Sequence, residues 1–356
     1  MISILMAFSS LTGGGMSSFV KEIVRSIDKD KYHIDLLVYE EGDPEITKWM
    51  EDYGCGIYLV PNPKKDYPGC KEKIAALHQK NAYHVMHSLN LFNSGYMVQI
   101  AYQLGIPVRI VNSHASQDFH EGFIYQIYKY LMRNKMKKYG THFIACSEIA
   151  GKYLFDTIPF EVIENAIDVE RFSFKEENRN LIRQQYHFEE DDFVIGMIGM
   201  VTKNKNQSFM LDVLKDMDSK YKLLIVGDGD YRKEIDEKIQ QLNLTDRVTI
   251  TGWIQDTCPY YSALDCLVMP SFSEGFPLTG LEGQASGLPI IFSDTITKEI
   301  QIAKNVYYLS TQDVKGWQEK IISFSETQNN HANSLMGTKF DSRVNIKEWY
   351  AIYESK

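Results

Sequence analysis

Short apolar runs alternate with helical stretches along almost the whole of this 356-residue sequence. Runs that can form buried strands lie at 1–8, 34–38, 57–60, 85–87, 108–112 and 143–147 in the first half, and at 193–199, 223–226, 248–251, 266–269 and 290–292 in the second. Strands that alternate with helices form parallel sheets with helices on both faces. We therefore predict an α/β protein with two Rossmann-like domains, each built on a doubly wound parallel sheet.

The length of the chain is sufficient for two domains of ordinary size, each with its own core. The first series of strands ends before residue 168, and the second series begins after a charged helical stretch. We predict an N-terminal domain over 1–168 and a C-terminal domain over 169–339.

Composition and charge exclude several classes of protein. A net charge of −9 argues against a general nucleic-acid binder, and no apolar run is long enough to span a membrane. The first residues lack the basic start of a signal peptide and indicate a buried strand instead. The five cysteines have no metal-binding or redox spacing, which favours reduced packing residues in a cytoplasmic protein.

The stretch 263–294 contains the strongest functional signal in the sequence. Its apolar runs predict two buried strands, and Pro277 between them suits the first turn of a helix, where an N–H would be unpaired anyway. The N–H groups of Leu278 and Thr279 would then be free at a helix N-terminus just beyond the end of a strand. Such a position favours a phosphate or a diphosphate.

Two glutamates lie on either side of this expected anion site. Glu274 precedes the helix, and Glu282 lies about one turn inside it. Carboxylates repel phosphate, but each carboxylate can accept two hydrogen bonds from sugar hydroxyls. A ribose at Glu282 and a hexose at Glu274, with a diphosphate between them, would describe a nucleotide sugar. The alternative is an ordinary strand–loop–helix unit with two solvated glutamates.

The segment from Glu274 to Glu282 resembles the E-x7-E motif of the family 4 retaining glycosyltransferases, which have the GT-B fold. The similarity extends from the N-terminal glycine loop to the last helix. Ser-Asp at 293–294, followed by Lys-Glu at 298–299, is similar to enzymes of bacterial capsule and exopolysaccharide synthesis.

This resemblance implies a metal-independent enzyme that needs no cofactor. It would move a hexose, with retention, from a nucleotide-diphosphate sugar (with UDP as the expected nucleotide) to a glycan or lipid-linked acceptor. The two domains would face a cleft in which the chemistry takes place, and the helix in 340–356 would cross back to pack on the first domain. We expect a cytoplasmic protein that is peripheral on the inner face of the membrane. The alternative function is a non-catalytic homologue that acts as the partner or stabiliser of another glycosyltransferase.

His114 follows the strand predicted at 108–112. In an α/β domain, side chains at the carboxyl end of a strand lie where ligands bind, and at this place the family has a histidine that contacts the transferred sugar. The alternative is a histidine whose ring is satisfied by nearby backbone groups.

The loop 199–206 resembles the family loop G-R-x-x-x-x-K-N, in which the arginine and the lysine both bind the diphosphate. Lys205 matches the lysine, whereas Met200 stands in the position of the arginine. A bidentate phosphate contact is therefore lost, and Lys203 can compensate only as a point charge.

The resemblance makes Glu274, His114 and Lys205 the candidate catalytic residues. It assigns donor binding to Gly14, Gly15, Gly199, Lys205, Gly227, Trp253, Ile254, Glu274, Gly275, Phe276, Pro277, Leu278, Thr279 and Glu282. The two glycines at 14–15 follow the first strand, and for them a tight turn is the alternative. Asp228 and Asp230 form a D-x-D string, which we interpret as a turn rather than a manganese site.

The segment 123–138 combines aromatic and aliphatic side chains with five basic residues, Lys129, Arg133, Lys135, Lys137 and Lys138. A basic helix with aromatic residues can lie on an anionic bilayer, so we predict that these five residues contact an anionic membrane surface. The alternative is a core helix with a solvated basic face.

Overall fold

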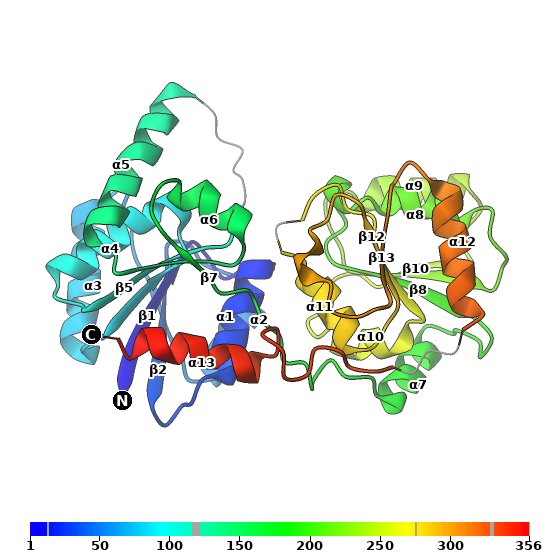
Figure 1. The fold of residues 1–356 in the computed structure, drawn as a ribbon, viewed down its shortest axis with the longest axis horizontal. Coiled ribbons are helices and arrows are strands. Elements are labelled where there is room, and N and C mark those ends of the chain that lie inside the picture. The colour runs from blue at the N-terminus through cyan, green and yellow to red at the C-terminus, as the bar shows by residue number, and fades with distance from the viewer. Residues whose placement is uncertain (13, 116–121, 275, 328–330, 356) are drawn as a thin grey trace. The chain divides into compact units, whose positions relative to one another are not determined.

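The computed structural model describes residues 1–12, 14–115, 122–274, 276–327 and 331–355. The chain forms two compact units, which are drawn in Figure 1. Unit 1 consists of Met1–Ala166 together with Ser342–Lys356, and unit 2 consists of Ile167–Asp341. The prediction of two α/β units with parallel sheets is confirmed.

Unit 1 contains a parallel sheet with the strand order β3-β2-β1-β4-β5-β6-β7. Its strands are β1 Ile2–Phe8, β2 Tyr32–Val38, β3 Gly56–Leu59, β4 Val85–Ser88, β5 Val108–Ser113, β6 His142–Ala145 and β7 Glu161–Val162. Its helices are α1 Gly15–Ser26, α2 Pro44–Asp52, α3 Tyr67–Asn81, α4 Ser94–Gln103, α5 Phe123–Tyr139, α6 Glu148–Phe155 and α13 Ser342–Tyr353, with a short 3-10 turn at Leu91–Asn93.

Alternate residues of the central strand β1 pack on opposite faces of this sheet. Ile4, Met6 and Phe8 pack with apolar residues of α1, α2 and α13, whereas Leu5 and Ala7 pack with residues of α3 and α4. Both faces are therefore covered, as they are in parallel sheets generally. This double burial explains why β1 reads as an unbroken apolar run.

The C-terminal helix α13 belongs to unit 1. Trp349 and Tyr353 are fully buried, and the Tyr350 ring stacks on that of Tyr32 with centroids 4.8 Å apart. The Tyr350 hydroxyl also accepts a hydrogen bond from the backbone N–H of Asp28 at 2.9 Å. The last helix of the chain is thus part of the core that the first helix helps to form.

Unit 2 contains a parallel sheet with the strand order β10-β9-β8-β11-β12-β13. Its strands are β8 Phe193–Ile198, β9 Tyr221–Val226, β10 Val248–Ile250, β11 Cys266–Met269, β12 Ile290–Ser293 and β13 Val306–Leu309. Its helices are α7 Glu176–Gln185, α8 Gln207–Leu214, α9 Arg232–Gln241, α10 Cys258–Ala263, α11 Leu278–Ala285 and α12 Val314–Ser325, with 3-10 turns at Lys203–Lys205 and Lys298–Ile300.

Unit 2 also has a core on each face of its sheet. Leu267 and Met269 of β11 pack with α10 and α11, and Cys266 and Val268 of the same strand pack with α8 and α12. All five cysteines are buried free thiols. In the described part of the chain, none of the helices combines the length and the apolar character that crossing a membrane requires.

Candidate functional site

Two loops at the carboxyl edge of the unit 2 sheet bring the predicted donor residues together. The first, which we call the lysine loop, is residues 199–206 and follows β8. The second, which we call the glutamate loop, is residues 270–274 and follows β11. Because β8 and β11 are hydrogen-bonded neighbours in a parallel sheet, the loops that follow them lie at the same edge.

Lys205 and Glu274 form an ion pair between these loops. The Lys205 Nζ lies 2.7 Å from Oε1 of Glu274, and the side chains are 24% and 12% exposed. The structure therefore brings together a cation that suits a phosphate and a carboxylate that suits sugar hydroxyls. The lysine has three N–H donors, so a bound anion can compete with Glu274 for them.

Backbone contacts fix the two loops against each other. The Asn204 side-chain amide donates to the carbonyl of Ser273 at 2.7 Å, and the Phe272 N–H donates to the carbonyl of Asn204 at 2.9 Å. The Asn206 amide donates to the carbonyl of Pro270 at 3.2 Å. Sequence reasoning missed Asn204, because nothing in its neighbourhood indicates a partner 69 residues away.

The start of the glutamate loop is also tied to the neighbouring strand β12. The Ser293 and Thr295 hydroxyls both donate to the carbonyl of Ser271, at 2.5 and 3.0 Å. Ser293 is fully buried. Satisfied buried donors of this kind restrict the path of the chain toward Glu274.

The start of α11 differs from the prediction. The helix begins at Leu278, and Pro277 is its N-cap rather than its first residue. The N–H of Leu278 donates to the carbonyl of Phe276 at 3.0 Å, so the prediction that this N–H is free is wrong. The cause is a tight three-residue turn, which the backbone angles of Pro277 (φ −79°, ψ 88°) permit. Thr279 is then the candidate backbone donor, and Gly275 lies outside the described residues.

Glu282 has a buried partner that sequence reasoning did not find. The hydroxyl of Tyr261, in α10, donates to the Glu282 carboxylate. Burial, followed by the negative charge of Glu282, raises the pKa of Tyr261 well above its usual value, so this hydroxyl stays protonated. No signal in the sequence links these two residues, because it is the packing of α10 beside α11 that joins them.

Four more predicted donor residues lie at the same edge of the sheet. Gly199 follows β8, and Gly227 follows β9 with a φ of +145°. A side chain at Gly227 would place its Cβ 2.1 Å from the Gly199 carbonyl oxygen, so this close approach requires glycine. Trp253, after β10, is 50% exposed, whereas Ile254 packs against the core of unit 2.

Asp228, the first carboxylate of the D-x-D string, takes part in the turn after β9. Its Oδ1 accepts the N–H of Gly229 at 2.9 Å and lies 4.0 Å from Nη1 of Arg232. Asp230 is an exposed neighbour. These contacts agree with a turn at this position.

In unit 1, the predicted glycine residues form the start of α1. Gly14 is the N-cap with a φ of +125°, a conformation that favours glycine, and Gly15 is the first helical residue. A Cβ at either position would meet no atom of the described residues within 4 Å, apart from its own chain neighbours. The described residues therefore leave space beside this helix N-terminus, which follows β1.

His114 follows β5 and contacts the ring of Phe19 in α1, with centroids 4.4 Å apart. Both ring nitrogens are buried, and neither has a hydrogen-bond partner among the described residues. None of the described residues therefore supports the alternative of a histidine satisfied by nearby backbone groups. Burial lowers the pKa of His114 to about 3. The ring is neutral at ordinary pH and can donate one hydrogen bond and accept another, as contact with a hydroxyl requires.

The helix α5 presents only two of the five predicted basic residues to solvent. Lys129 is buried, with its Nζ about 5 Å from the ring centroids of Phe92 and Tyr153. Arg133 donates to the backbone carbonyls of Tyr153 and Leu154 at 2.8 and 2.9 Å. Positions 129 and 133 are one turn apart, so both side chains lie on the face of the helix that packs on the unit.

Lys135 is also engaged. Its Nζ donates to the side-chain oxygen of Gln99 at 2.5 Å, and burial lowers its pKa. The prediction of a five-residue basic surface is therefore wrong: Lys137 and Lys138 alone of the five are exposed. The sequence shows charges along a helix but not which of them tertiary packing turns inward.

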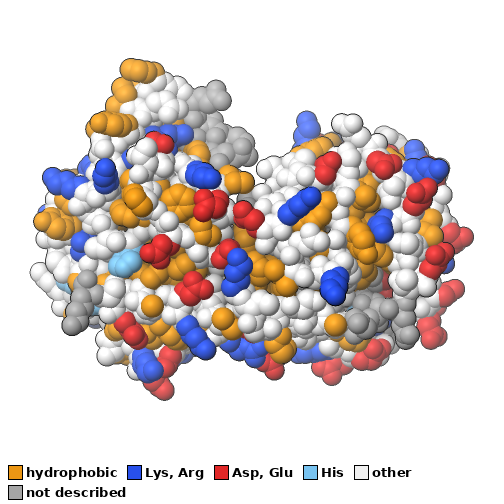
Figure 2. Space-filling model, in the orientation of Figure 1, with side chains coloured by type: hydrophobic (Ala, Val, Ile, Leu, Met, Phe, Trp, Pro, Cys, Tyr) orange, Lys and Arg blue, Asp and Glu red, His pale blue; other side chains and the backbone are white. Residues whose placement is uncertain are grey.

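The outward side of α5 is apolar instead. Its exposed residues are Phe123 (81%), Ile124 (83%), Ile127 (44%), Tyr130 (64%) and Leu131 (50%). The spacing of four and three residues places them in one stripe along the helix. Figure 2 shows apolar side chains along the protruding α5. We call this set the α5 stripe.

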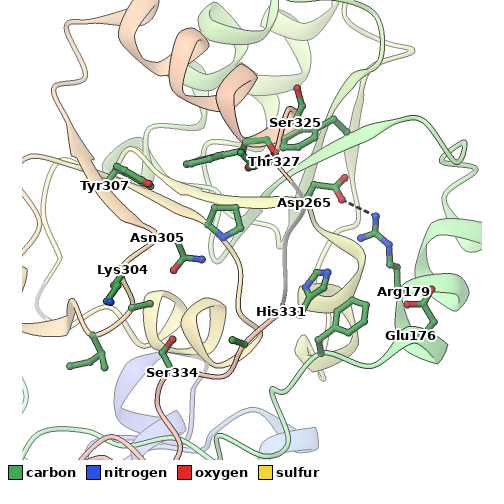
Figure 3. Close-up of a pocket in the computed structure, with 17 residues that line it drawn as sticks. Glu176, Arg179, Asp265, Lys304, Asn305, Tyr307, Ser325, Thr327, His331 and Ser334 are labelled. Carbon is green, nitrogen blue, oxygen red and sulfur yellow. Dashed lines mark hydrogen bonds and ion pairs between the residues drawn. The ribbon is translucent and has the colours of Figure 1, made fainter.

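A cavity of about 910 Å³ in unit 2 lies at the opposite, amino-terminal edge of the sheet (Figure 3). Asp265, Pro289 and Asn305, which line it, each precede a strand. Asp265 pairs with Arg179 at 2.8 Å and with Arg183 at 3.2 Å. The cavity contains a structural ion pair, and none of the predicted donor residues that the structure describes lines it.

Two family models match the chain. The model of glycosyltransferase family 4 matches residues 13–171, and the model of glycosyl transferases group 1 matches residues 178–336. The first lies in unit 1 apart from its last residues, and the second lies wholly in unit 2. Together they span most of the chain.

Several curated proteins are similar along most of their length. EpsF of Bacillus subtilis (strain 168), whose name describes it as a proposed glycosyltransferase, is 27% identical to this chain. The alignment covers 89% of this chain and 86% of EpsF. The capsular polysaccharide biosynthesis glycosyltransferase CapH of Staphylococcus aureus is 24% identical over 100% of this chain and 99% of its own. An Escherichia coli UDP-Gal:alpha-D-GlcNAc-diphosphoundecaprenol alpha-1,3-galactosyltransferase is 27% identical to this chain. Its alignment covers 75% of this chain and 73% of the Escherichia coli protein.

Among solved structures, HepE of Anabaena in complex with UDP and glucose aligns with a TM-score of 0.81 over 100% of both chains. Sequence identity is 17%, so this likeness concerns the fold. The GT-B prediction of two parallel-sheet α/β domains is thereby confirmed.

Proposed function

This chain belongs to the GT-B glycosyltransferases that combine a family 4 domain with a group 1 domain, and on this premise we propose that it moves a hexose from a nucleotide-diphosphate sugar to a glycan or lipid-linked acceptor. The proposed setting is bacterial surface polysaccharide synthesis, in which CapH, by its name, takes part. The observation that carries the proposal is the convergence of Lys205, Glu274 and Glu282 at one edge of the unit 2 sheet.

Each of the three residues has a distinct proposed role. Lys205 binds the diphosphate, Glu274 accepts hydrogen bonds from hexose hydroxyls, and Glu282 accepts them from the ribose. UDP is the first nucleotide to test, because HepE was solved with UDP and the Escherichia coli relative is named for a UDP sugar. Because its ammonium group has three N–H donors, Lys205 can hold the diphosphate while it stays paired with Glu274.

The proposed reaction retains the configuration of the sugar. The bond from the anomeric carbon to the phosphate oxygen breaks, and the bond to the acceptor oxygen forms on the same face. Lys205 and the N–H of Thr279 stabilise the negative charge that grows on the leaving diphosphate. The acceptor proton passes to a phosphate oxygen, since a histidine with a pKa of about 3 is a poor base at neutral pH. His114 instead holds a sugar hydroxyl.

Calorimetry with two glutamate variants tests this assignment. We expect Glu282→Ala to weaken the binding of free UDP by about tenfold or more, because hydrogen bonds to a charged group contribute about 1.5–3 kcal/mol. Glu274→Ala should leave UDP binding nearly unchanged and weaken the binding of the matching UDP sugar, chosen from a set of nucleotide sugars by thermal stabilisation.

Glu319→Ala, which alters an exposed glutamate of α12, is the matched control and should change neither affinity. Equal loss of UDP affinity in both glutamate variants would contradict the assignment. Binding of a nucleotide sugar without turnover on any acceptor would favour the non-catalytic homologue, whose motivation is Met200 in the arginine position.

We further propose that the reaction needs no divalent metal. Asp228 is engaged by the N–H of Gly229 and lies near Arg232, so its carboxylate is used within the turn. Release of UDP from a UDP sugar, measured with acceptor present, should be unchanged by EDTA. Complete inactivation by EDTA that manganese reverses would overturn this expectation.

The α5 stripe is the proposed contact with a membrane that carries a lipid-linked acceptor. An apolar helix face with exposed lysines at one end, here Lys137 and Lys138, suits the interface of an anionic bilayer. The Escherichia coli relative, by its name, acts on an acceptor linked to diphosphoundecaprenol.

Sedimentation with vesicles tests this contact. Ile124→Asp should strongly reduce binding to anionic vesicles at any ionic strength, because it places a charge in the apolar face. The pair Lys137→Glu and Lys138→Glu should remove a salt-sensitive part of about 2 kcal/mol. Ile149→Ser, which alters an exposed residue of α6 outside the stripe, should have no effect. A wild-type protein that stays in the supernatant at low salt would exclude the membrane contact.

A further inference from the structure

The two glutamates of the candidate donor site are held by different neighbours. The loop that carries Glu274 is fixed by Asn204, whereas the carboxylate of Glu282 is fixed by Tyr261. We infer that Asn204 and Tyr261 are positioning residues for the donor, and that each acts through one glutamate: Asn204 controls recognition of the sugar, and Tyr261 controls recognition of the nucleoside. The inference rests on the proposed function.

Asn204 holds the residues that directly precede Glu274. Its side-chain amide donates to the carbonyl of Ser273 at 2.7 Å, and its own carbonyl accepts the N–H of Phe272 at 2.9 Å. One residue thus fixes two successive residues of the glutamate loop through both a donor and an acceptor. The Glu274 carboxylate that follows these residues lies 2.7 Å from Nζ of Lys205.

The other contacts of the glutamate loop lie farther from Glu274. Asn206 holds the carbonyl of Pro270, and Ser293 and Thr295 hold the carbonyl of Ser271. These bonds fix where the loop leaves the strand. Asn204 determines how the loop ends. Its side chain is exposed, so its replacement should change the position of Glu274 without removing a part of the core.

Tyr261 holds Glu282 from within the core. The side chain is fully buried, and its ring meets that of Phe172 edge-on, with centroids 5.5 Å apart. The hydroxyl therefore has a fixed position from which it donates to the Glu282 carboxylate. A directed bond from a rigid aromatic side chain selects one orientation of the carboxylate.

The two supports predict separable effects on binding. The nucleoside is common to free UDP and to a UDP sugar, so a change that acts through Glu282 weakens both ligands equally. The hexose is present in the conjugate alone, so a change that acts through Glu274 weakens the conjugate and leaves free UDP unaffected. A general loss of structure would not distinguish the two ligands in this way.

Calorimetry with UDP and UDP-glucose provides the test, with substitutions that remove a hydrogen bond at nearly constant shape. We expect Asn204→Leu, which keeps the size of the side chain and adds no charge, to weaken UDP-glucose by about tenfold and to change the affinity for UDP less than twofold. Tyr261→Phe should weaken both ligands by about tenfold, with the ratio of their affinities unchanged. Asn204→Ala should behave as Asn204→Leu does, since both lack the amide donor.

Matched controls come from the same unit. Tyr260→Phe alters the neighbour of Tyr261 in α10 and removes its hydroxyl contact with Tyr186, and Asn305→Leu removes an asparagine–carbonyl bond at the opposite edge of the sheet. Both variants should bind as the wild type does. Equal weakening of UDP and UDP-glucose by Asn204→Leu, or unchanged UDP binding in Tyr261→Phe, would overturn the inference alone. A wild-type protein that binds neither ligand would overturn the proposed donor, and the inference with it.

Discussion

Replacing Lys205 with alanine should lower the rate of glycosyl transfer by about 10²–10³-fold, the usual effect of removing one preorganised group that stabilises growing negative charge. The effect should be large here because the family arginine is absent: Met200 occupies its position and is 57% exposed. Lys205, 2.7 Å from Glu274, is the cation that the structure places among the predicted donor residues. Initial rates at saturating donor and acceptor measure the change.

Two lysine variants distinguish this role from a general effect of charge. Lys203→Ala, on the same 3-10 turn, tests whether Lys203 compensates for Met200; its side chain is exposed, so we expect a loss of less than about threefold. Lys315→Ala, on α12, removes an exposed lysine far along the chain and should have no effect. A Lys205→Ala variant that retains most of the wild-type rate would show that the leaving diphosphate is stabilised elsewhere.

The strands could be predicted where they are buried on both faces. The run 266–269 is apolar at every position because alternate side chains enter two different cores. β13, at Val306–Leu309, was not predicted. It lies at the edge of its sheet, and three of its four residues are half-buried, so its apolar signal is weaker.

The site could be predicted only as far as the chain order of strand, loop and helix determines it. That order places Lys205 and Glu274 at one edge of the sheet, but it does not show that they pair. The bond between Tyr261 and Glu282 depends on how two helices pack. The bonded N–H of Leu278 depends on a single turn, and the inward lysines of α5 depend on which helix face meets the unit. Three of the four are products of tertiary structure, and the Leu278 bond is the product of one local turn.

Replacing Trp349 with alanine should lower the free energy of unfolding of unit 1 by about 3–5 kcal/mol, the usual cost of deleting a large buried aromatic side chain. Trp349 is fully buried in α13, with its ring 5.7 Å from that of Phe19 in α1 and 5.0 Å from that of His87 in β4. The substitution therefore leaves a cavity where the last helix joins the first helix and a central strand.

Urea denaturation followed by circular dichroism measures this loss, with the transitions of the two units fitted separately. Trp253→Ala is the matched control: that ring is 50% exposed in unit 2, so its removal should cost less than about 1 kcal/mol. The Nδ1 atom of His87 also forms a hydrogen bond of 3.1 Å with the Tyr353 hydroxyl of α13. If α13 loosens, the buried His87 ring therefore loses this partner as well. If Trp349→Ala unfolds at the same urea concentration as the wild type, α13 does not stabilise unit 1, and the C-terminal helix is an accessory rather than a part of the N-terminal core.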